Sequence, residues 1–276
     1  MKFFLREIRS SSVLLIASSL IVVFVGIAIF GPLLSPHDPE TMNWEHIGEA
    51  PSATHWFGTD DVGRDLFART VEGMRVSFAI ALIATGVALA IGIPWGAFAA
   101  MRGGYVDQIM MRIVDAIYCL PGLLIIILLV VVFGRNQYLL FAGIGAIAWL
   151  DIARIVRGQT LQIRESLYIA AAKSLGGKTG YVLRKHVIPN VIGPIVIYST
   201  LLIPGVILLE STISFLGLGI QEPDTSLGVL VSDGTQVMET SPWLLVFPAS
   251  VLALVVWSLN TLGDRLRAAN QSSLES

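Results

Sequence analysis

The sequence predicts an all-α membrane protein with six membrane-spanning helices. The 276 residues are 54% hydrophobic and only 14% charged, a composition too apolar for a soluble domain. About 20 apolar residues in a helix cross a hydrocarbon layer of roughly 30 Å. Six apolar segments of about that size follow one another along the chain: residues 13–34, 76–101, 113–133, 138–155, 191–215 and 243–262.

The first segment, residues 13–34, follows the basic residues Lys2, Arg6 and Arg9, as the apolar core of a secretory signal peptide would. It is longer than the roughly 7–15 residues of such a core, and no A-x-A-like cleavage site comes before Gly31-Pro32. We therefore interpret it as an uncleaved first span after a cytoplasmic N-terminal segment, residues 1–12.

Residues 35–75 are polar, acidic and proline-bearing, which predicts a periplasmic loop. Residues 58–65 contain capping-type side chains, and apolar residues follow at helical spacing. These are Leu66, Phe67, Thr70, Val71 and Met74. The pattern predicts an interfacial helix that leads into the second span.

Three acids of this loop, Asp60, Asp61 and Asp65, could be considered a site for a hard cation. They lack EF-hand spacing, and Arg64 and Arg69 lie among them as ion-pair partners. Helix capping and ion pairing are therefore the favoured interpretation.

Three histidines, His37, His46 and His55, recur at nine-residue intervals in the same loop. Metal binding would require them to converge. A flexible, proline-rich loop is not expected to hold them on one face, so we interpret the spacing as coincidence.

Prolines and glycines occur in the later spans. They are Pro94, Pro121, Pro204 and Pro248, with Gly86, Gly92, Gly96, Gly122 and Gly205 nearby. Close helix packing and kinks that allow inward- and outward-facing shapes explain them equally well. The lone Cys119 excludes an intramolecular disulfide and is expected to have a packing role.

The distribution of Lys and Arg predicts the topology. With the N-terminus inside, only Arg64, Arg69, Arg75 and Arg135 of the 18 basic residues lie outside. Both termini, including the tail at residues 263–276, are then cytoplasmic. The segment 35–75 and the segment 217–242 are external.

The segment between the fourth and fifth spans, residues 159–187, combines small residues with a glycine break. Ala170, Ala171 and Ala172 favour a helix with a closely approachable surface, and Gly176 provides a C-terminal stop. Residues 159–175 are predicted to cross the cytoplasmic face and residues 178–187 to return, with Pro189 where the next helix enters the membrane. Such a loop could reach another subunit, and Ala172 and Gly176, four residues apart, are predicted to share the helix face that contacts it. The alternative is an ordinary solvated loop between two spans.

Motifs for catalysis or nucleotide binding are missing from the sequence. Gly177-Lys178-Thr179 resembles the end of a phosphate-binding loop, but Ala172 occupies the position of its first glycine. The sequence contains no GxSxG or HExxH pattern. An enzyme is therefore not predicted.

Three acids lie within or near the spans and could belong to a proton or ion pathway. Asp115 is expected to pair with Arg112, and Asp151 with Arg154, at i,i+3 spacing. Glu210 has no basic residue within a helical turn. It is predicted to line a pathway or to contact a partner subunit.

The segment around Ala170 resembles the cytoplasmic loop of ABC importer permeases. That loop reads Glu-Ala-Ala, three residues, Gly, nine residues, then Ile-x-Leu-Pro. Ala171, Ala172, Gly176 and Pro189 match it. The chain departs from it at three positions, Ala170 for Glu, His186 for Ile and Ile188 for Leu.

The resemblance extends over nearly the whole chain, to the C-type permease of oligopeptide and dipeptide importers. The final residues, 268–276, depart from the Asp-Pro ending that is common in that family. The matching segments are Trp56-Phe-Gly-Thr-Asp-Asp-Val-Gly-Arg-Asp65 with Arg69, Gly73, Arg75 and Ser77, Met111-Arg-Ile-Val-Asp115, Ala153-Arg-Ile-Val-Arg-Gly-Gln-Thr160, Ser214-Phe-Leu-Gly-Leu-Gly219 and Leu262-Gly-Asp-Arg-Leu-Arg267.

The resemblance implies an inner-membrane subunit that forms half of a peptide pathway, with type I importer architecture and a coupling helix. It implies four kinds of partner: a homologous B-type permease, two ATPases that bind ATP and Mg, a periplasmic peptide-binding protein and the peptide itself. No cofactor in this chain and no nucleic acid are expected. The alternatives are an ABC permease for nickel or a glycoside, and a self-sufficient secondary transporter or channel.

Overall fold

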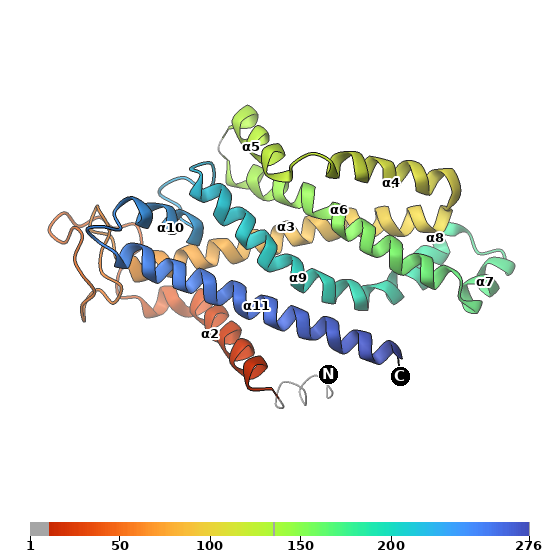
Figure 1. Ribbon diagram of the computed structural model, residues 1–276, viewed down its shortest axis with the longest axis horizontal. Helices are drawn as coiled ribbons and strands as arrows, with labels where there is room; N and C mark the ends of the chain where they lie inside the picture. The colour runs from red at the N-terminus through yellow and green to blue at the C-terminus, as the bar shows by residue number, and fades with distance from the viewer. Residues whose placement is uncertain (1–10, 135, 276) are drawn as a thin grey trace.

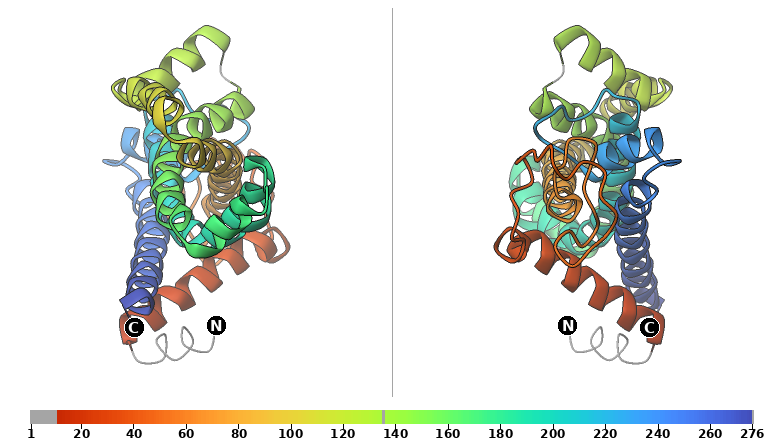
Figure 2. Two further views of the ribbon diagram at one scale, coloured as in Figure 1. Left: turned by 90° about the vertical axis from the view of Figure 1, so that its right-hand side faces the viewer. Right: turned by 90° about the vertical axis from the view of Figure 1, so that its left-hand side faces the viewer.

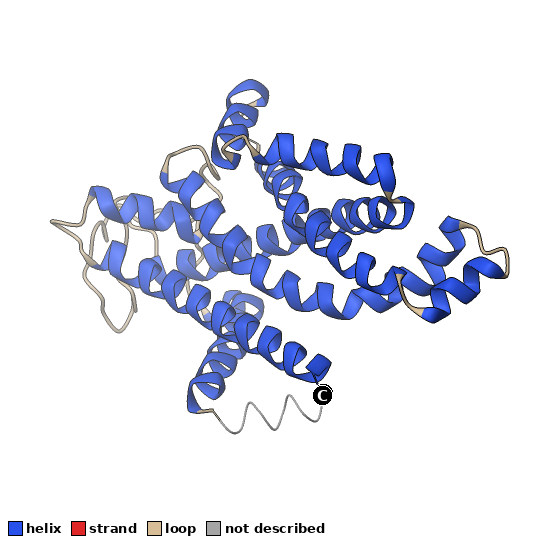
Figure 3. Cartoon of the chain, turned by 45° about the vertical axis from the view of Figure 1, so that its right-hand side comes forward, coloured by secondary structure: helices blue, strands red, loops and turns tan. Residues whose placement is uncertain are grey.

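The computed structural model describes residues 11–134 and 136–275, which form helices joined by loops (Figures 1 and 3). Five of these helices are long and apolar enough to cross a membrane, and α4 with α5 makes a sixth if the bent pair is one span. The predicted all-α fold is therefore confirmed. The elements are α2 (Ser12–Leu34), α3 (Leu66–Arg102), α4 (Gly104–Tyr118), α5 (Gly122–Phe133), α6 (Gln137–Arg164), α7 (Leu167–Ser174), α8 (Thr179–Val182), the π-helix η1 (Leu183–Val187), α9 (Ile188–Phe215), α10 (Leu227–Gln236) and α11 (Trp243–Glu275).

The two ends of the molecule differ in their elements. The loop 35–65 and α10 lie at one end of the long axis, and α7 and α8 lie at the other (Figure 1). We call these the α10 end and the α7 end. Helix α3 runs from the α10 end toward the α7 end, and α6 leads into α7 (Figure 1).

Helix α3 lies near the centre of the bundle when it is viewed along the long axis (Figure 2), and α6 packs closely along it. A Cβ atom on Gly92 would lie 2.7 Å from Ile152, and one on Gly96 would lie 2.2 Å from the carbonyl oxygen of Ala153. The packing explanation is confirmed for these two glycines. It does not extend to Gly86, around which a Cβ would meet nothing within 4 Å.

The third predicted span, residues 113–133, is not one straight helix. It is divided between α4 and α5, which are bent by 76° at Cys119, Leu120 and Pro121. Pro121 has no N–H for the helical ladder and disfavours helical geometry in the preceding residue, which explains the break. Cys119 is exposed at the bend, so the predicted packing role of this cysteine inside the chain is wrong.

Three other element boundaries differ from the sequence prediction. The predicted interfacial helix is the start of α3, which continues without a break and buries Leu66, Val71 and Met74. Helix α6 extends to Arg164, beyond the predicted end of the fourth span. Helix α11 likewise continues through most of the predicted tail, to Glu275. Apolar length alone underestimates these helices because their ends contain charged and polar residues.

Candidate functional site

The predicted coupling loop forms a short helix at the α7 end of the molecule (Figure 1). The chain turns at Glu165 and Ser166, forms α7, turns again, and returns through α8 and η1 to α9. The transverse part is therefore shorter than the predicted 159–175, because α6 occupies the residues up to Arg164. Pro189 is exposed in the first turn of α9, where a missing N–H is tolerated.

Gly176 ends α7 as predicted. Its φ is +84°, its N–H donates to the carbonyl of Lys173, and the N–H of Gly177 donates to the carbonyl of Ala172. This pair of bonds is a Schellman motif, which satisfies the last carbonyls of a helix. The left-handed backbone explains the preference for glycine at position 176. Space is not the reason, because a Cβ on Gly176 would meet nothing within 4 Å.

The exposed face of α7 differs from the predicted one. Ala172 is partly buried and packs with Ile169 against the core of this chain, while Gly176 lies beyond the last helical residue. These two residues therefore do not form one docking face, and that prediction is wrong. The side chains of Ala170 and Ala171 are exposed instead.

Two leucines flank these alanines at the tip of the loop. Leu167 is 88% exposed and Leu175 is 89% exposed. The exposed surface of α7 is thus a small-residue patch with a protruding apolar side chain at each end. This surface leaves two large apolar side chains uncovered in the described chain.

Two ion pairs join α4 to α6 between this loop and the middle of the bundle. Arg157 donates to both carboxylate oxygens of Asp107, at 2.6 and 2.7 Å, and Arg154 donates to Asp115 at 2.9 Å. The predicted pairs of Asp115 with Arg112 and of Asp151 with Arg154 are therefore wrong. Arg154 also lies over the ring of Tyr118, 4.1 Å from its centroid, which is a second contact of this side chain with α4.

Glu210 lies on α9 in a fully buried network of hydroxyl groups. Ser214 donates to one of its carboxylate oxygens at 2.7 Å, and Ser77 of α3 donates to the other at 3.2 Å. Ser226, the N-cap of α10, donates to the hydroxyl of Ser214. Glu210 thus connects three helices of its own chain. A contact with a pathway or a partner requires this network to open and stays a prediction.

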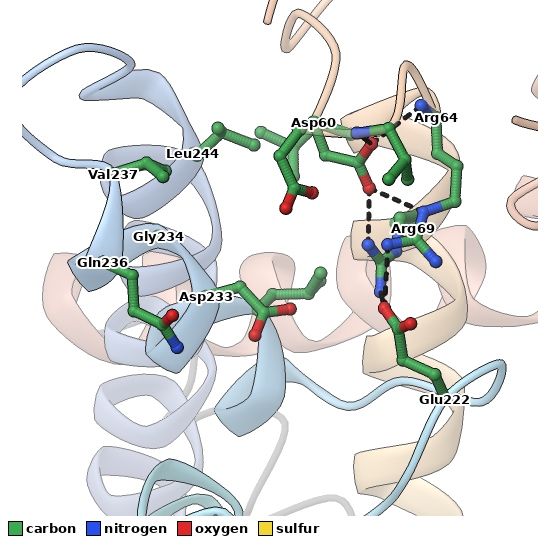
Figure 4. A pocket seen from close by; sticks show the side chains of 13 residues that line it. Asp60, Arg64, Arg69, Glu222, Asp233, Gly234, Gln236, Val237 and Leu244 are labelled. Carbon is green, nitrogen blue, oxygen red and sulfur yellow. Dashed lines mark hydrogen bonds and ion pairs between the residues drawn. The ribbon is translucent and has the colours of Figure 1, made fainter. Parts of the chain in front are cut away.

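The α10 end contains a polar cavity of about 150 Å³ between the loop that precedes α3 and the helices α10 and α11 (Figure 4). On one wall Asp60 accepts hydrogen bonds from Arg64 and Arg69, and Arg64 also donates to Glu222 at 2.8 Å. Asp233 lines the cavity across from them.

The charges of this wall are matched, as the ion-pair interpretation of the acids predicts. Burial disfavours the charge of Asp60, but hydrogen bonds from the backbone and guanidinium of Arg64, together with Arg69, outweigh it. The pKa of Asp60 therefore lies below its ordinary value of 3.8. Asp65 caps α3 by accepting from the N–H of Ala68 at 2.8 Å.

The three histidines lie close together in the folded loop, so the prediction that a flexible loop would not hold them on one face is wrong. The rings of His37 and His55 have centroids 4.6 Å apart, and His46 lies 5.8 Å from His55. The loop is held by its own hydrogen bonds, such as the bonds that join Glu49 with Thr59 and Asn43 with Val62. A proline-rich composition indicated flexibility, but it did not reveal these bonds.

Sequence reasoning missed two functional groupings. Asp107 was not singled out, although it pairs with Arg157 of the motif at 153–160, and Glu222 was not connected with the arginines of the motif at 56–65. The signal that could have revealed these pairs is the charge of the motifs. Segments distant in sequence that carry charges of opposite sign are candidates for pairing.

Comparison with known proteins defines the class to which this fold and these motifs belong. Residues 92–275 match the family described as binding-protein-dependent transport system inner membrane component, and residues 2–51 match the N-terminal TM domain of oligopeptide transport permease C. The chain belongs to the family of binding-protein-dependent transport system inner membrane components. It is a multi-pass inner membrane protein.

Individual relatives are similar over nearly the full length. The chain is 41% identical to the oligopeptide transport system permease protein OppC of Bacillus subtilis (strain 168), over 95% of this chain and 86% of that protein. It is 43% identical to OppC of Escherichia coli (strain K12), over 92% and 85%. It is 39% identical to the dipeptide transport system permease protein DppC of Bacillus subtilis (strain 168), over 96% and 83%.

The fold has a solved counterpart in a structure entitled inward facing conformations of the MetNI methionine ABC transporter. The TM-score is 0.59 at 18% identity, over 72% of this chain and 94% of that chain. This similarity shows that about seven tenths of the chain shares the fold of that structure. The relatives are permease subunits rather than enzymes, which agrees with the lack of catalytic motifs and disfavours a self-sufficient secondary transporter.

Proposed function

We propose that this chain forms half of the translocation pathway of an ATP-driven importer for oligopeptides or dipeptides. The observation that carries the proposal is its similarity to oligopeptide and dipeptide permeases, which covers more than 90% of the chain for each of the three relatives named above. Its proposed partners are a homologous B-type permease, two ABC ATPases and a periplasmic peptide-binding protein. ATP and Mg belong to the ATPases in this proposal.

Helix α7 is proposed to be the element that receives force from an ATPase. Ala170 and Ala171 permit close approach, and Leu167 and Leu175 supply apolar side chains that can insert into the partner. Below α7, the ion pairs from α6 to α4 and the close packing of α6 on α3 provide a stiff connection. A displacement of α7 would therefore move the bundle rather than a loose loop.

The α10 end is proposed to face the periplasm and the α7 end the cytoplasm, with both chain termini cytoplasmic. The positive-inside distribution supports this orientation, since Lys173, Lys178, Arg184 and Lys185 are exposed around the α7 end. The test labels single cysteines at Glu45 and Lys178 with an impermeant reagent in intact cells. Cys119 is first replaced by Ser because it is exposed. Labelling of position 178 alone would reverse the proposed orientation.

The coupling role is tested by comparing two substitutions of one exposed residue. Ala171→Trp adds bulk to the docking surface, whereas Ala171→Ser keeps it small and serves as the matched control. In vesicles reconstituted with the partner subunits and loaded binding protein, Trp is expected to abolish ATP-driven peptide uptake and Ser to preserve it. Normal uptake by the Trp variant would show that α7 is only a connector.

The substrate class is tested in the same vesicles with labelled di- and oligopeptides, nickel and a glycoside. Uptake of peptide that depends on ATP and on the binding protein supports the proposal. Uptake of nickel or the glycoside without peptide uptake would replace peptide with that solute.

A further inference from the structure

Side chains from three separate parts of the loop before α3 converge at the α10 end of the molecule. His37 follows the end of α2 closely, His55 lies in the middle of the loop, and Asp65 is the N-cap of α3. One ligand atom from each of these residues lies within 4.8 Å of the others. The Nδ1 atom of His55 is 2.8 Å from Oδ2 of Asp65, and that of His37 is 3.6 Å from the same oxygen.

We propose that His37, His55 and Asp65 bind a divalent transition metal ion of the zinc class. Zinc is bound at about 2.0–2.2 Å by imidazole nitrogens and carboxylate oxygens, so neighbouring donors of a tetrahedral site lie roughly 3.4 Å apart. The distances from Oδ2 of Asp65 to the Nδ1 atoms of His55 and His37, 2.8 and 3.6 Å, lie below and above that donor spacing. Two imidazoles with one carboxylate are a donor set suited to zinc rather than to calcium or magnesium, which prefer oxygen ligands alone.

The ligands are held in place by neighbouring groups. Oδ1 of Asp65 accepts from the N–H of Ala68, which turns Oδ2 toward the histidines. The carbonyl of His55 accepts from the N–H groups of Ser52 and Gly58, and its own N–H donates to the hydroxyl of Ser52. These bonds fix the backbone of His55 and orient the carboxylate of Asp65 before an ion binds. Burial agrees, since the side chains of Asp65 and His55 are only 4% and 11% exposed.

An ion can reach these residues from one side. They line a cavity of about 490 Å³ that also includes Thr41, Asn43 and His46. The side chain of His37 is 37% exposed, so one ligand faces solvent while the other two are enclosed. Three protein ligands leave a coordination position for water or for a group from outside the chain.

The proposed ion would cross-link three segments of the loop that hydrogen bonds and ring contacts already bring together. It would tie the segment after α2 to the first turn of α3, near the wall formed by Asp60, Arg64 and Arg69. Closing long loops in this way stabilises the folded loop relative to its open forms. We infer a structural role for the ion in ordering the surface at the α10 end.

Zinc binding by the purified, full-length chain in nanodiscs, without a polyhistidine tag, tests the proposal. Zn²⁺ is titrated in competition with a chromogenic chelator, and Co²⁺ absorption reports the coordination. The wild type is expected to bind one equivalent of Zn²⁺, and His37→Ala to weaken that affinity by about tenfold or more. Asp65→Asn is expected to do the same while it keeps the cap of α3.

The matched control is His186→Ala, which removes a histidine from the opposite end of the chain and should leave zinc affinity unchanged. His37 is partly exposed, so its replacement leaves no buried group unpaired and the variant should fold. Absence of stoichiometric zinc binding by the wild type would overturn the proposal and leave His55 and Asp65 as a hydrogen-bonded pair. Wild-type affinity in His37→Ala would overturn it equally.

A second measurement follows the loop itself. Hydrogen exchange of residues 35–65 should slow when Zn²⁺ is added to the wild type and should not respond in His37→Ala. Unchanged exchange in the zinc-bound wild type would contradict the cross-linking role.

Discussion

Arg157 of α6 donates hydrogen bonds to both carboxylate oxygens of Asp107 of α4, at 2.6 and 2.7 Å. The other arginine of the same motif, Arg154, donates to Asp115 of α4. Helix α4 is one half of a broken span. It also packs against α3, where the indole N–H of Trp95 donates to the carbonyl of Met110 at 3.3 Å. The two ion pairs add an attachment of α4 to α6.

We expect Arg157→Ala to destabilise the chain by about 1–2 kcal/mol, since a bidentate, charge-assisted pair is lost but is partly exposed to solvent. The thermal unfolding midpoint in detergent measures the effect. In a double-mutant cycle, Asp107→Ala should have little further effect once Arg157 is gone. Arg75→Ala, which removes the exposed pair with Glu72, is the matched control and should change stability by less than about 0.5 kcal/mol. Additive effects of Arg157→Ala and Asp107→Ala would contradict the coupling.

Glu210 should be important as a hydrogen-bond acceptor for buried hydroxyls. Glu210→Leu leaves Ser77 and Ser214 without their acceptor, and each such group is expected to reduce stability by about 1–3 kcal/mol. Glu210→Gln keeps one acceptor oxygen and should be milder. Yield, unfolding midpoint and peptide uptake are compared for both variants. If Glu210→Leu leaves all three unchanged, neither the network nor a pathway or partner role matters.

Gly176 should tolerate only residues that adopt a left-handed backbone. Gly176→Asn is expected to resemble the wild type, whereas Gly176→Val should destabilise the end of α7 by about 1–2 kcal/mol because its φ is +84°. No atom lies within 4 Å of the added Cβ, so the effect comes from the backbone and not from a clash. ATPase stimulation by loaded binding protein and proteolysis within residues 165–178 are the measurements. Equal behaviour of Asn and Val would contradict the Schellman cap.

The order of the loop before α3 should depend on the charge of Asp60. The pKa of this carboxyl is lowered in the folded loop, so its contribution is present above the ordinary value of 3.8 and is lost as the pH falls through the lower, folded value. Hydrogen exchange of residues 58–66, corrected for intrinsic rates, should be constant from about pH 7 to 5 and rise only below about pH 4.

The variant Asp60→Asn isolates this group from the other acids. It should exchange faster than the wild type at pH 7, because Arg64 and Arg69 lose their shared counter-charge. The difference between the two proteins should shrink at low pH. A difference that grows on acidification would contradict the assignment.

The all-α fold class and the family were predictable from the amino-acid sequence, and five of the six predicted spans correspond to single long apolar helices. An apolar run long enough to span the membrane is a local feature, so the sequence alone indicates it. The motifs around Arg64, Arg154 and Gly176 are short contiguous segments and are recognised in the same way. The glycine stop of α7 was predictable for the same reason, because a left-handed residue is a local requirement.

Which side chains meet depends on the packing of the folded chain. Arg154 has Asp151 one turn away but pairs with Asp115, because packing of α4 on α6 brings the more distant residue closer. Ala172 faces inward and Ala171 outward, which depends on how α7 lies against the bundle. His37 and His55 converge on Asp65 through hydrogen bonds spread over the whole loop. Long-range contacts of this kind depend on the packed arrangement of distant segments, which no local pattern encodes.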